Sequence, residues 1–467
     1  MRLGIKIVCR RKKDENQKKS IPERAHPKKD NGRVKIITGI RRCGKSYLLF
    51  ELYKDYLLEN GVRKEQIIEM PLDEIENIRF RNPFELDAHI KDKIADTSRR
   101  HYVFIDEIQL CAEVPNPYVD TPDEKVTFID TVLGLMKIKN VDVYVTGSNS
   151  KMLSKEVLTQ FRDRGDEIRV FPLSFAEFCP AYEEVRSRSP IPASSSSSFF
   201  DARTGDAWRD YCTYGGMPYL LSLETPEEKS QYLKNLFEET YIKDIIERND
   251  IRNDKEILEI LLDFVSSAIG SLTNPSKLEA RFRSEKKIKV SHNTIAGYLD
   301  YFREAYILDS AKRYDIKGAG YFSTPLKYYF TDIGLRNARL NFRQIEETHI
   351  MENIIYNELI RRGYNVDVGV VQYNSRRKTE KGEKRATIQL EVDFVVNQGN
   401  RRYYIQSALH IDEPQKKEQE INSLNRIDDS FRKIVVTKDN IIPWHDEKGI
   451  LYLGVQDFLL NEQAIDL

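Results

Sequence analysis

A glycine-rich segment near the start of the chain has the residue types and spacing of a phosphate-binding loop. The eight residues Gly39–Ser46 match the pattern GxxxxGK[ST] at every fixed position. Such glycines let backbone N–H groups converge on phosphate oxygens at a helix N-terminus, where the helix dipole also favours an anion. We expect Lys45 to reach the β- and γ-phosphates and Ser46 to ligate Mg²⁺. The residues predicted to contact ATP are Gly39, Ile40, Arg41, Arg42, Cys43, Gly44, Lys45, Ser46 and Asn149.

Two acidic residues follow an apolar run, sixty-one positions after the loop lysine. Asp106 and Glu107 come directly after Tyr102–Ile105. An acid at the carboxyl end of a buried strand beside a phosphate loop is typical of a magnesium ligand, and a second acid can polarise the attacking water. We therefore assign Asp106 to the metal and Glu107 to catalysis. The segment Thr146–Asn149 ends another apolar run and offers polar groups to the γ-phosphate or the water, or it forms an ordinary turn.

Two arginines, Arg162 and Arg164, stand before a further apolar run. In a ring or a dimer, one guanidinium could enter a neighbouring subunit's site and neutralise transition-state charge. We prefer Arg164 for this role. The alternative, that both are ordinary surface arginines, stays open.

The elements that must position these groups are short apolar runs alternating with helical patterns. Buried runs separated by helices predict an α/β fold, a P-loop parallel sheet with helices on both faces, in which all five strands are buried. A helical pattern over Tyr47–Tyr53 follows the phosphate loop. The predicted strands are Val34–Thr38, Gln66–Met70, Tyr102–Ile105, Val141–Thr146 and Ile168–Phe171.

Downstream of the predicted sheet, the pattern changes twice. Amphipathic helices and two strand-like runs, Ile307–Tyr314 and Tyr321–Thr331, predict a winged helix whose recognition helix runs over Ile295–Ala305. A separate α/β order follows. The predicted domains are a basic mobile arm (1–33), the ATPase core (34–171), a helical subdomain with a Ser-rich loop (172–245), the winged helix (246–345) and the last α/β domain (346–467).

Basic and polar residues lie around the predicted recognition helix. A basic rim there supplies phosphate contacts, while short polar side chains reach base edges, so double-stranded DNA is one expected partner. Winged helices also dock proteins, and nearby acids dilute the charge, so a protein client is the alternative. The predicted DNA contacts are Lys286, Lys287, Lys289, Asn293 and Lys317.

Composition narrows the class of protein. The 467 residues carry 74 Lys or Arg and 74 Asp or Glu, so any nucleic-acid site must come from local clustering. No apolar run approaches the ~18 residues that cross a bilayer, so we expect no membrane partner. The five cysteines are scattered without a CxxC pair, which favours a reducing compartment, and we expect the cytoplasm.

Several motifs together resemble a known family. GIRRCGKS, FIDEIQ, VTGSNS, FRDRGDEIRVFPLSFAEF, YGGMPYLL and EVDFVV look like the prokaryotic AAA+ type ATPases in which the ATPase core precedes a winged helix and a restriction-nuclease-like domain. The likeness runs from about Val34 to the end of the chain. It implies ATP hydrolysis and a nucleic-acid connection, and leaves the client open.

The last domain resembles the PD-(D/E)XK nuclease fold, in which acidic or amide side chains bind a divalent metal and a lysine activates water. By this resemblance the site comprises Glu352, Asp393 and Gln406, of which Asp393 and Gln406 fit the metal positions, and Ala408 stands at the lysine position. An alanine neither orients water nor stabilises charge, so we expect a degenerate site that does not cut. Lys416 or Lys417 of the following helix is the candidate replacement for the missing lysine.

Three functions stay open on the sequence. The first is a Mg²⁺-dependent ATPase, which we expect to form a homo-oligomer, whose nucleotide state controls DNA- or protein-binding modules. The second is an ATP-dependent DNA nuclease, against which Ala408 argues. The third is a nucleotide-sensing assembly protein without significant turnover, against which Glu107 argues.

Overall fold

The computed structural model describes residues 29–94, 98–120, 123–147, 161, 164–188, 199–251, 255–343, 346–379, 382–411 and 414–467. The chain forms two compact units. Unit 1 comprises Met1–Pro172 and Glu304–Tyr306, and unit 2 comprises Leu173–Arg303 and Ile307–Leu467. Most of the predicted basic arm, most of the Ser-rich loop, Asn149 and Arg162 lie outside the described residues.

Unit 1 contains a five-stranded parallel sheet. Its order is β2 (Ile67–Pro71), β3 (His101–Asp106), β6 (Val141–Thr146), β1 (Val34–Thr38) and β7 (Gly165–Arg169). Every residue of β1, β3 and β6 is buried, which confirms the predicted α/β fold with a parallel sheet. The expectation that all five strands are buried is wrong for β7, in which only Ile168 is buried, because β7 is an edge strand with a neighbour on one side.

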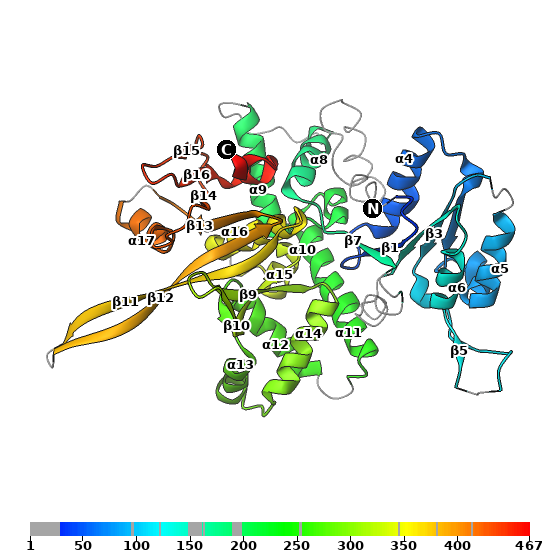
Figure 1. Cartoon of the computed structure of the whole chain (residues 1–467), viewed down its shortest axis with the longest axis horizontal. Coiled ribbons are helices and arrows are strands. Elements are labelled where there is room, and N and C mark those ends of the chain that lie inside the picture. The colour runs from blue at the N-terminus through cyan, green and yellow to red at the C-terminus, as the bar shows by residue number, and fades with distance from the viewer. Residues whose placement is uncertain are drawn as a thin grey trace. The chain divides into compact units, whose positions relative to one another are not determined.

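Helices cover both faces of this sheet. Neighbouring residues of a strand point to opposite faces, so Ile36 and Ile37 of β1 pack in two different cores. Ile36 packs in a core with residues of α5 (Pro83–Lys93) and α6 (Phe128–Leu135). Ile37 packs in a second core with the continuous helix formed by α3 (Lys45–Tyr47), the π-helical η3 (Leu48–Tyr53) and α4 (Lys54–Glu59). Figure 1 shows α4 on one side of the sheet and α5 and α6 on the other. The shorter elements are η4 (Lys64–Gln66), η5 (Ile75–Arg81), η6 (Ile108–Leu110), β4 (Val114–Pro115) and β5 (Lys125–Val126).

A buried ion pair joins β1 to β6. The Lys35 ammonium donates to Asp142 Oδ1, and both side chains are almost fully buried. The Tyr144 hydroxyl donates to Asp142 Oδ2 at 2.9 Å, and the Tyr53 hydroxyl lies 2.6 Å from that of Tyr144. Burial raises the pKa of Tyr144, and the Asp142 charge raises it further. The network lies near the N-terminal ends of the strands, so it stabilises the sheet away from the phosphate loop.

Unit 2 begins with helices and contains a mixed sheet. A Ser174–Glu177 capping box starts the first helix, because the Ser174 hydroxyl accepts from Glu177 N–H at 3.1 Å and Glu177 Oε2 accepts from Ser174 N–H at 2.9 Å. The helical elements are α8 (Phe175–Arg188), α9 (Phe199–Tyr214), η8 (Pro218–Ser222), α10 (Pro226–Asn235), η9 (Leu236–Ile242), α11 (Lys243–Arg248), α12 (Lys255–Ser267), α13 (Pro275–Arg281), η10 (Phe282–Lys286), α14 (His292–Glu304), α15 (Ile333–Arg339), α16 (Glu347–Arg361), α17 (Pro414–Asn425), α18 (Val455–Leu460) and η11 (Ala464–Asp466).

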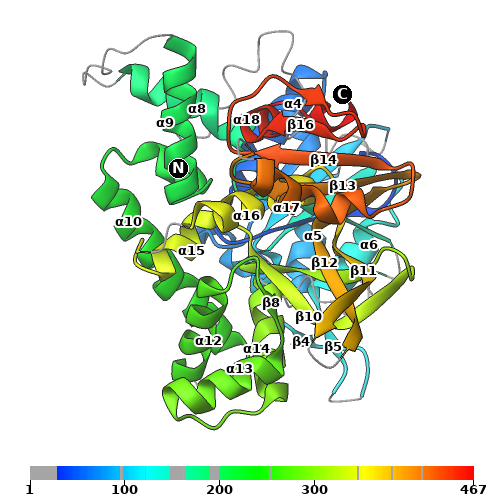
Figure 2. The same ribbon diagram turned by 90° about the vertical axis from the view of Figure 1, so that its left-hand side faces the viewer.

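One nine-stranded sheet spans the region predicted as a winged helix and the last α/β region (Figure 2). The joint is a parallel pairing between Val368–Val370 and Arg313–Asp315. This sheet contains strands from both sides of residue 345, where the sequence predicts a domain boundary, and that boundary stays a prediction. The strand order is β15 (Trp444–His445), β16 (Leu451–Gly454), β14 (Arg432–Thr437), β13 (Arg401–Ala408), β12 (Gly382–Gln398), β11 (Asn365–Thr379), β9 (Leu308–Asp315), β10 (Gly320–Phe330) and β8 (Leu272–Thr273).

The YGGMPYLL motif has a packing role inside unit 2. Asp332 caps α15 through Leu335 N–H and also accepts from Gly216 N–H at 2.7 Å. A Cβ on Gly215 would lie 2.2 Å from Asp332 Oδ1, and one on Gly216 would lie 2.2 Å from the Leu173 carbonyl oxygen. The two glycines are required because the backbone approaches these groups too closely for a side chain.

None of the described helices is long and apolar enough to span a membrane. The cysteines among the described residues, Cys43, Cys111, Cys179 and Cys212, are free thiols.

Candidate functional site

The phosphate loop of unit 1 adopts a conformation that needs its glycines. Gly39 and Gly44 have φ of 137° and 104°, in the region that favours glycine. A Cβ on Gly39 would lie 2.1 Å from the Val170 carbonyl oxygen, so the loop runs directly against the chain after β7. Gly44 is the N-cap of the helix that continues to Glu59.

Lys45 and Ser46 occupy the first turn of that helix. The Lys45 ammonium is nearly buried and donates to the carbonyl oxygens of Gly39 at 3.0 Å and Ile40 at 3.1 Å. The charge of Lys45 is therefore held inside the loop by neutral acceptors. Ser46, the next residue, is exposed. The buried Cys43 thiol approaches the Val170 carbonyl oxygen at 3.5 Å, and burial raises its pKa, so it fills space as a neutral group.

Asp106 ends β3 and is surrounded by hydroxyl groups. Thr146 at the end of β6 donates from its hydroxyl to Asp106 Oδ1, and the Glu107 N–H donates to the same oxygen at 3.1 Å. Burial raises the pKa of Asp106, while hydrogen bonds from Thr146 and Ser46 oppose that rise. The structure thus brings Ser46, Asp106 and Thr146 together at the carboxyl edge of the sheet, as the sequence predicts for the first two.

Glu107 follows Asp106 with a strained backbone. Its φ is 48°, in the left-handed region, which a residue other than glycine adopts at a cost of about 1–3 kcal/mol. The Gln109 side-chain amide donates to Glu107 Oε2. Strain of this kind is common at functional sites. Here it turns the chain sharply after the strand, next to the group assigned to the metal.

The donor set of this edge fits a nucleotide with Mg²⁺. A carboxylate and a hydroxyl are the hard oxygen ligands that Mg²⁺ takes when substrate phosphates complete its shell. Backbone N–H groups of the glycine loop and the Lys45 ammonium provide the complementary positive charge for phosphates. Asp106 and Ser46 are therefore the residues that would hold the metal.

Arg164 lies at the opposite edge of the same sheet. Its carbonyl oxygen accepts from Val34 N–H at 3.0 Å, just before β7, and its side chain is exposed. Val34 begins β1 and pairs with Gly165, whereas the phosphate loop follows the other end of β1. Five strand residues span ~16 Å. Arg164 therefore lies at the end of the strands that is remote from the phosphate loop of its own chain.

The predicted DNA contacts of unit 2 are exposed. Lys286 ends η10, Lys287 and Lys289 follow in the loop before α14, Asn293 lies in the first turn of α14, and Lys317 lies in the turn between β9 and β10. The Ser291 hydroxyl accepts from Thr294 N–H at 3.1 Å and caps α14. Nearby Arg281 and Arg283 form ion pairs with Glu285 and Glu279 at 2.9 and 3.0 Å. Lys286, Lys287, Lys289 and Lys317 form no ion pair with the described residues.

The residues assigned to the degenerate nuclease site also come together. Glu352 lies on α16, Asp393 on β12 and Gln406 on β13. Gln406 Oε1 accepts from Asp393 N–H at 3.3 Å. Between the acids lies the ammonium of Lys327 from β10, 2.9 Å from Glu352 Oε1 and 3.8 Å from Asp393 Oδ1. It also lies 2.7 Å from Glu391 Oε1.

The charged groups of this cluster shift one another's pKa values. Burial alone would raise the pKa of Glu352, but the Lys327 charge, the nearby His349 ring and hydrogen bonds from Lys327 and Tyr329 outweigh it, so the pKa is lowered. Burial raises the pKa of Asp393 well above its usual range, and the Glu352 charge adds to this. Burial disfavours the ammonium of Lys327, yet the three carboxylates outweigh it and raise its pKa.

Sequence reasoning missed Lys327. The sequence predicts a replacement lysine in α17, Lys416 or Lys417. The Lys417 ammonium lies 4.6 Å from the ring centres of Trp444 and Tyr452. The Lys416 side chain is outside the described residues. A signal was present, because Lys327 interrupts the apolar run Leu326–Phe330 of a strand. A buried charge in such a run needs a partner.

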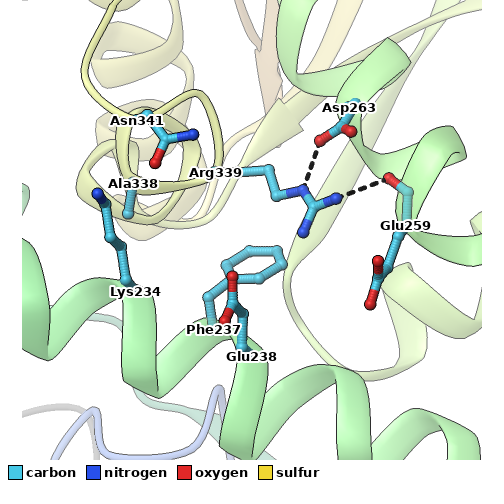
Figure 3. A pocket seen from close by; sticks show the side chains of 8 residues that line it. All are labelled: Lys234, Phe237, Glu238, Glu259, Asp263, Ala338, Arg339 and Asn341. Atoms are coloured by element: carbon cyan, nitrogen blue, oxygen red, sulfur yellow. Dashed lines mark hydrogen bonds and ion pairs between the residues drawn. The ribbon is translucent and has the colours of Figure 1, made fainter.

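A polar cavity of 310 Å³ lies elsewhere in unit 2 (Figure 3). Arg339 crosses it and donates to Asp263 and to the Glu259 carbonyl oxygen. Basic and acidic side chains both line this cavity, so it favours neither an anionic nor a cationic ligand. The lining residues are Lys234, Phe237, Glu238, Glu259, Asp263, Ala338, Arg339 and Asn341.

Comparison with known sequences agrees with the site geometry. The model of the family described as AAA domain matches residues 31–179, and that of a domain of unknown function (DUF8612) matches residues 205–346. The first match covers the whole glycine loop and both acids. Together with the parallel sheet, it identifies residues 31–179 as a P-loop domain of the AAA ATPase type.

Whole-length relatives define the family. An uncharacterized protein of Haemophilus influenzae is 31% identical over 434 residues, which are 93% of this chain and 96% of that protein. The chain belongs to the family of that protein. The uncharacterized protein MJ1544 of Methanocaldococcus jannaschii is 27% identical over 432 residues, 91% of this chain and 85% of that protein. Among solved structures, the Walker-type ATPase PABY2304 of Pyrococcus abyssi is similar, with 12% identity, a TM-score of 0.45, and coverage of 70% of this chain and 97% of that chain.

Proposed function

We propose that the chain is a Mg²⁺-dependent ATPase whose nucleotide state is coupled to a DNA-binding region in unit 2. The observation that carries the first part is the meeting of the phosphate loop with Asp106. Lys45 and Ser46 begin the helix after β1, and hydroxyls from that helix and from β6 reach the carboxylate that ends β3. Three consecutive strands of the sheet thus supply one site.

Each group has one task in this site. The loop N–H groups and Lys45 bind the phosphates, and Ser46 and Asp106 hold the metal, which when bound offsets phosphate charge. Glu107 orients the attacking water and accepts its proton. The backbone strain at Glu107 supports this role, because such strain is common at functional sites.

Phosphate release from ATP tests the proposal. The wild-type protein should release phosphate in Mg²⁺ and not in EDTA, and Asp106→Asn should lose the metal-dependent part of nucleotide binding because one hard ligand becomes an amide. A matched change on the surface of unit 1, Asp87→Asn, should leave both unchanged. Equal phosphate release in Mg²⁺ and EDTA would contradict the metal assignment.

A homo-oligomer supports catalysis in this proposal. Arg164 is exposed at the edge of the sheet away from its own phosphate loop, so it can serve only a neighbouring subunit's site. In that place it offsets charge on the transferring phosphoryl group. The scattered cysteines support a cytoplasmic setting.

The DNA-binding part rests on exposed lysines. The elements α12, α13 and α14 followed by the β9–β10 hairpin have the order of a winged helix, with α14 in the recognition position. Lys286, Lys287 and Lys289 lie just before α14 and carry charge that no described acid pairs. Phosphates of duplex DNA are the partner that such a rim fits.

Salt dependence of DNA affinity tests this part. Changing Lys286, Lys287 and Lys289 to Glu should lower the slope of log K against log salt by about three, because each lost phosphate contact lowers it by about one. The control changes three exposed lysines of unit 1, Lys64, Lys137 and Lys139, to Glu. If the first variant binds duplex DNA as the wild type does, the module docks a protein client instead.

The last region of unit 2 is proposed as a nuclease-like fold that does not cut. Ala408 is buried at the position of the activating lysine, and its side chain can neither accept a proton nor carry charge. Cleavage of DNA in Mg²⁺ or Mn²⁺ that Asp393→Ala abolishes would establish the nuclease alternative. Tight ATP binding without turnover would establish the nucleotide-sensing alternative.

A further inference from the structure

The acidic cluster of unit 2 is organised around a lysine. Lys327 lies on β10 with a strand on each side, since its backbone pairs with Ala311 of β9 and Leu272 of β8. Its side chain is 3% exposed and ends between Glu352 and Glu391, with Asp393 slightly farther away. The lengths of 2.7 and 2.9 Å are those of charge-assisted hydrogen bonds from an ammonium to carboxylates.

Groups other than Lys327 also engage oxygens of this cluster. The Tyr329 hydroxyl donates to Glu352 Oε1 at 2.8 Å, and the Ser407 N–H donates to Asp393 Oδ2 at 2.8 Å. Gln406 Oε1 is engaged by the Asp393 N–H. Each group that the resemblance assigns to a metal therefore has a partner within the protein.

The cluster is also closed on the side of Glu352. A Cβ on Gly270 would lie 2.9 Å from Glu352 Oε2 and 3.1 Å from His349 Nδ1, so the chain before β8 approaches the acid directly. A hydrated divalent ion needs several oxygens at metal-bond lengths around one point. Among the described residues, no group of three or more His, Cys, Asp or Glu side chains is arranged to hold a metal ion.

We propose that the Lys327 ammonium is the resident cation of this cluster and stands in the place where the resembling nucleases hold a divalent metal. Unit 2 then keeps a nuclease-like fold without binding a metal there, and the charge of Lys327 connects β10 to α16 and β12. This inference rests on the nuclease-like part of the proposed function, and it is independent of the ATPase site in unit 1.

Replacing the lysine should convert the cluster into a metal site. In Lys327→Met the three carboxylates lose their cation and repel one another, so the thermal midpoint in EDTA should fall by about 10 °C. Mn²⁺ should restore much of this loss in a saturable way, since a hard divalent ion suits carboxylate oxygens. The double variant Lys327→Met/Glu352→Gln, with one charge of each sign removed, should be more stable in EDTA than the single variant and respond less to Mn²⁺.

The experiment uses full-length, nucleotide-free protein carrying Asp106→Asn, so that metal at the ATPase site is not measured. Thermal unfolding and electron paramagnetic resonance of free Mn²⁺ are recorded for this parent, for Lys327→Met in it, and for the control Lys417→Met. The parent and the control should bind no Mn²⁺ through unit 2, and Lys327→Met should bind one. If Lys327→Met does not fold, the parent and the double variant still provide the test.

Two results would overturn the proposal. One is Mn²⁺ binding by the parent that Asp393→Ala removes, because the cluster would then be a metal site with the lysine beside it. The other is a folded Lys327→Met protein without Mn²⁺ binding. Neither result bears on ATP hydrolysis by the wild-type protein, so failure here is distinguishable from failure of the ATPase proposal.

Discussion

Unit 1 and unit 2 each contain a buried lysine, Lys45 and Lys327, and the two differ in what the ammonium group contacts. Lys45 donates to backbone carbonyl oxygens at 3.0 and 3.1 Å, and the acid assigned to the metal, Asp106, accepts from the Thr146 hydroxyl and the Glu107 N–H. Lys327 donates directly to carboxylates at 2.7 and 2.9 Å. The first lysine keeps its charge uncompensated, whereas the second is neutralised by its neighbours.

The difference indicates which cluster can do chemistry. A site that binds an anionic substrate must hold its cation with weak, neutral contacts that the substrate can replace. A cation that already has carboxylate partners gains little from a further ligand, and breaking such a pair leaves a buried charge. By this criterion unit 1 holds the reactive site, and the cluster of unit 2 stabilises the fold.

The largest expected effect comes from Arg164. If sites are shared between subunits, Arg164→Ala should lower ATP turnover by about 1,000-fold, as for other arginines that act in trans. Mixing Arg164→Ala with Glu107→Gln subunits should recover some turnover, because each variant supplies what the other lacks. The exposed Arg63→Ala is the control. No recovery, with specific activity independent of protein concentration, indicates a monomer whose site is complete by itself.

The acid partners of Lys327 should differ in their effect on stability. Glu352 is 7% exposed, so Glu352→Gln leaves a buried ammonium less compensated and should lower the free energy of unfolding by about 3 kcal/mol. Glu391 is 36% exposed, and Glu391→Gln should cost less than about 1 kcal/mol because water screens that pair. Urea unfolding measures both. Equal small losses would mean that the cluster does not stabilise unit 2.

Lys45 should behave in the opposite way. Lys45→Ala should leave unfolding in urea nearly unchanged, because its hydrogen bonds to neutral carbonyls contribute about 1 kcal/mol each or less. The same change should weaken ATP binding by about 30-fold, since charge-assisted contacts to phosphate are lost. A fluorescent nucleotide titration provides the measurement, with Lys91→Ala of α5 as the control. A large loss of stability with unchanged binding would reverse the comparison.

Sequence patterns predicted the central sheet of unit 1 well. The bounds of β1 and β6 agree with the predicted Val34–Thr38 and Val141–Thr146, because both strands are continuous apolar runs buried on both faces. The fifth strand was predicted about three residues too late. β7 begins with Gly165, Asp166 and Glu167, polar residues that an edge strand tolerates and that carry no apolar signal.

Unit 2 was harder to predict because its joints link distant segments. The parallel pairing of β9 with β11 connects Arg313–Asp315 to Val368–Val370, and nothing in either run specifies that neighbour. Lys327 was missed for the same reason, since its acid partners lie on α16 and β12, far along the chain. Glu352, Asp393 and Gln406 were found through the resemblance alone, and the structure does place them in one cluster.

The most direct test of this account compares two acid-to-amide changes of the same size, Glu107→Gln in unit 1 and Glu391→Gln in unit 2. The measurement is steady-state phosphate release from ATP in Mg²⁺, with nucleotide binding recorded in parallel. Glu107→Gln should keep nucleotide binding and lower turnover by at least about 100-fold, because it removes the group that accepts the proton of water. Glu391→Gln should retain turnover within about twofold, since its partner is a structural lysine. Wild-type turnover in Glu107→Gln, or its loss in Glu391→Gln, would contradict the assignment of chemistry to unit 1.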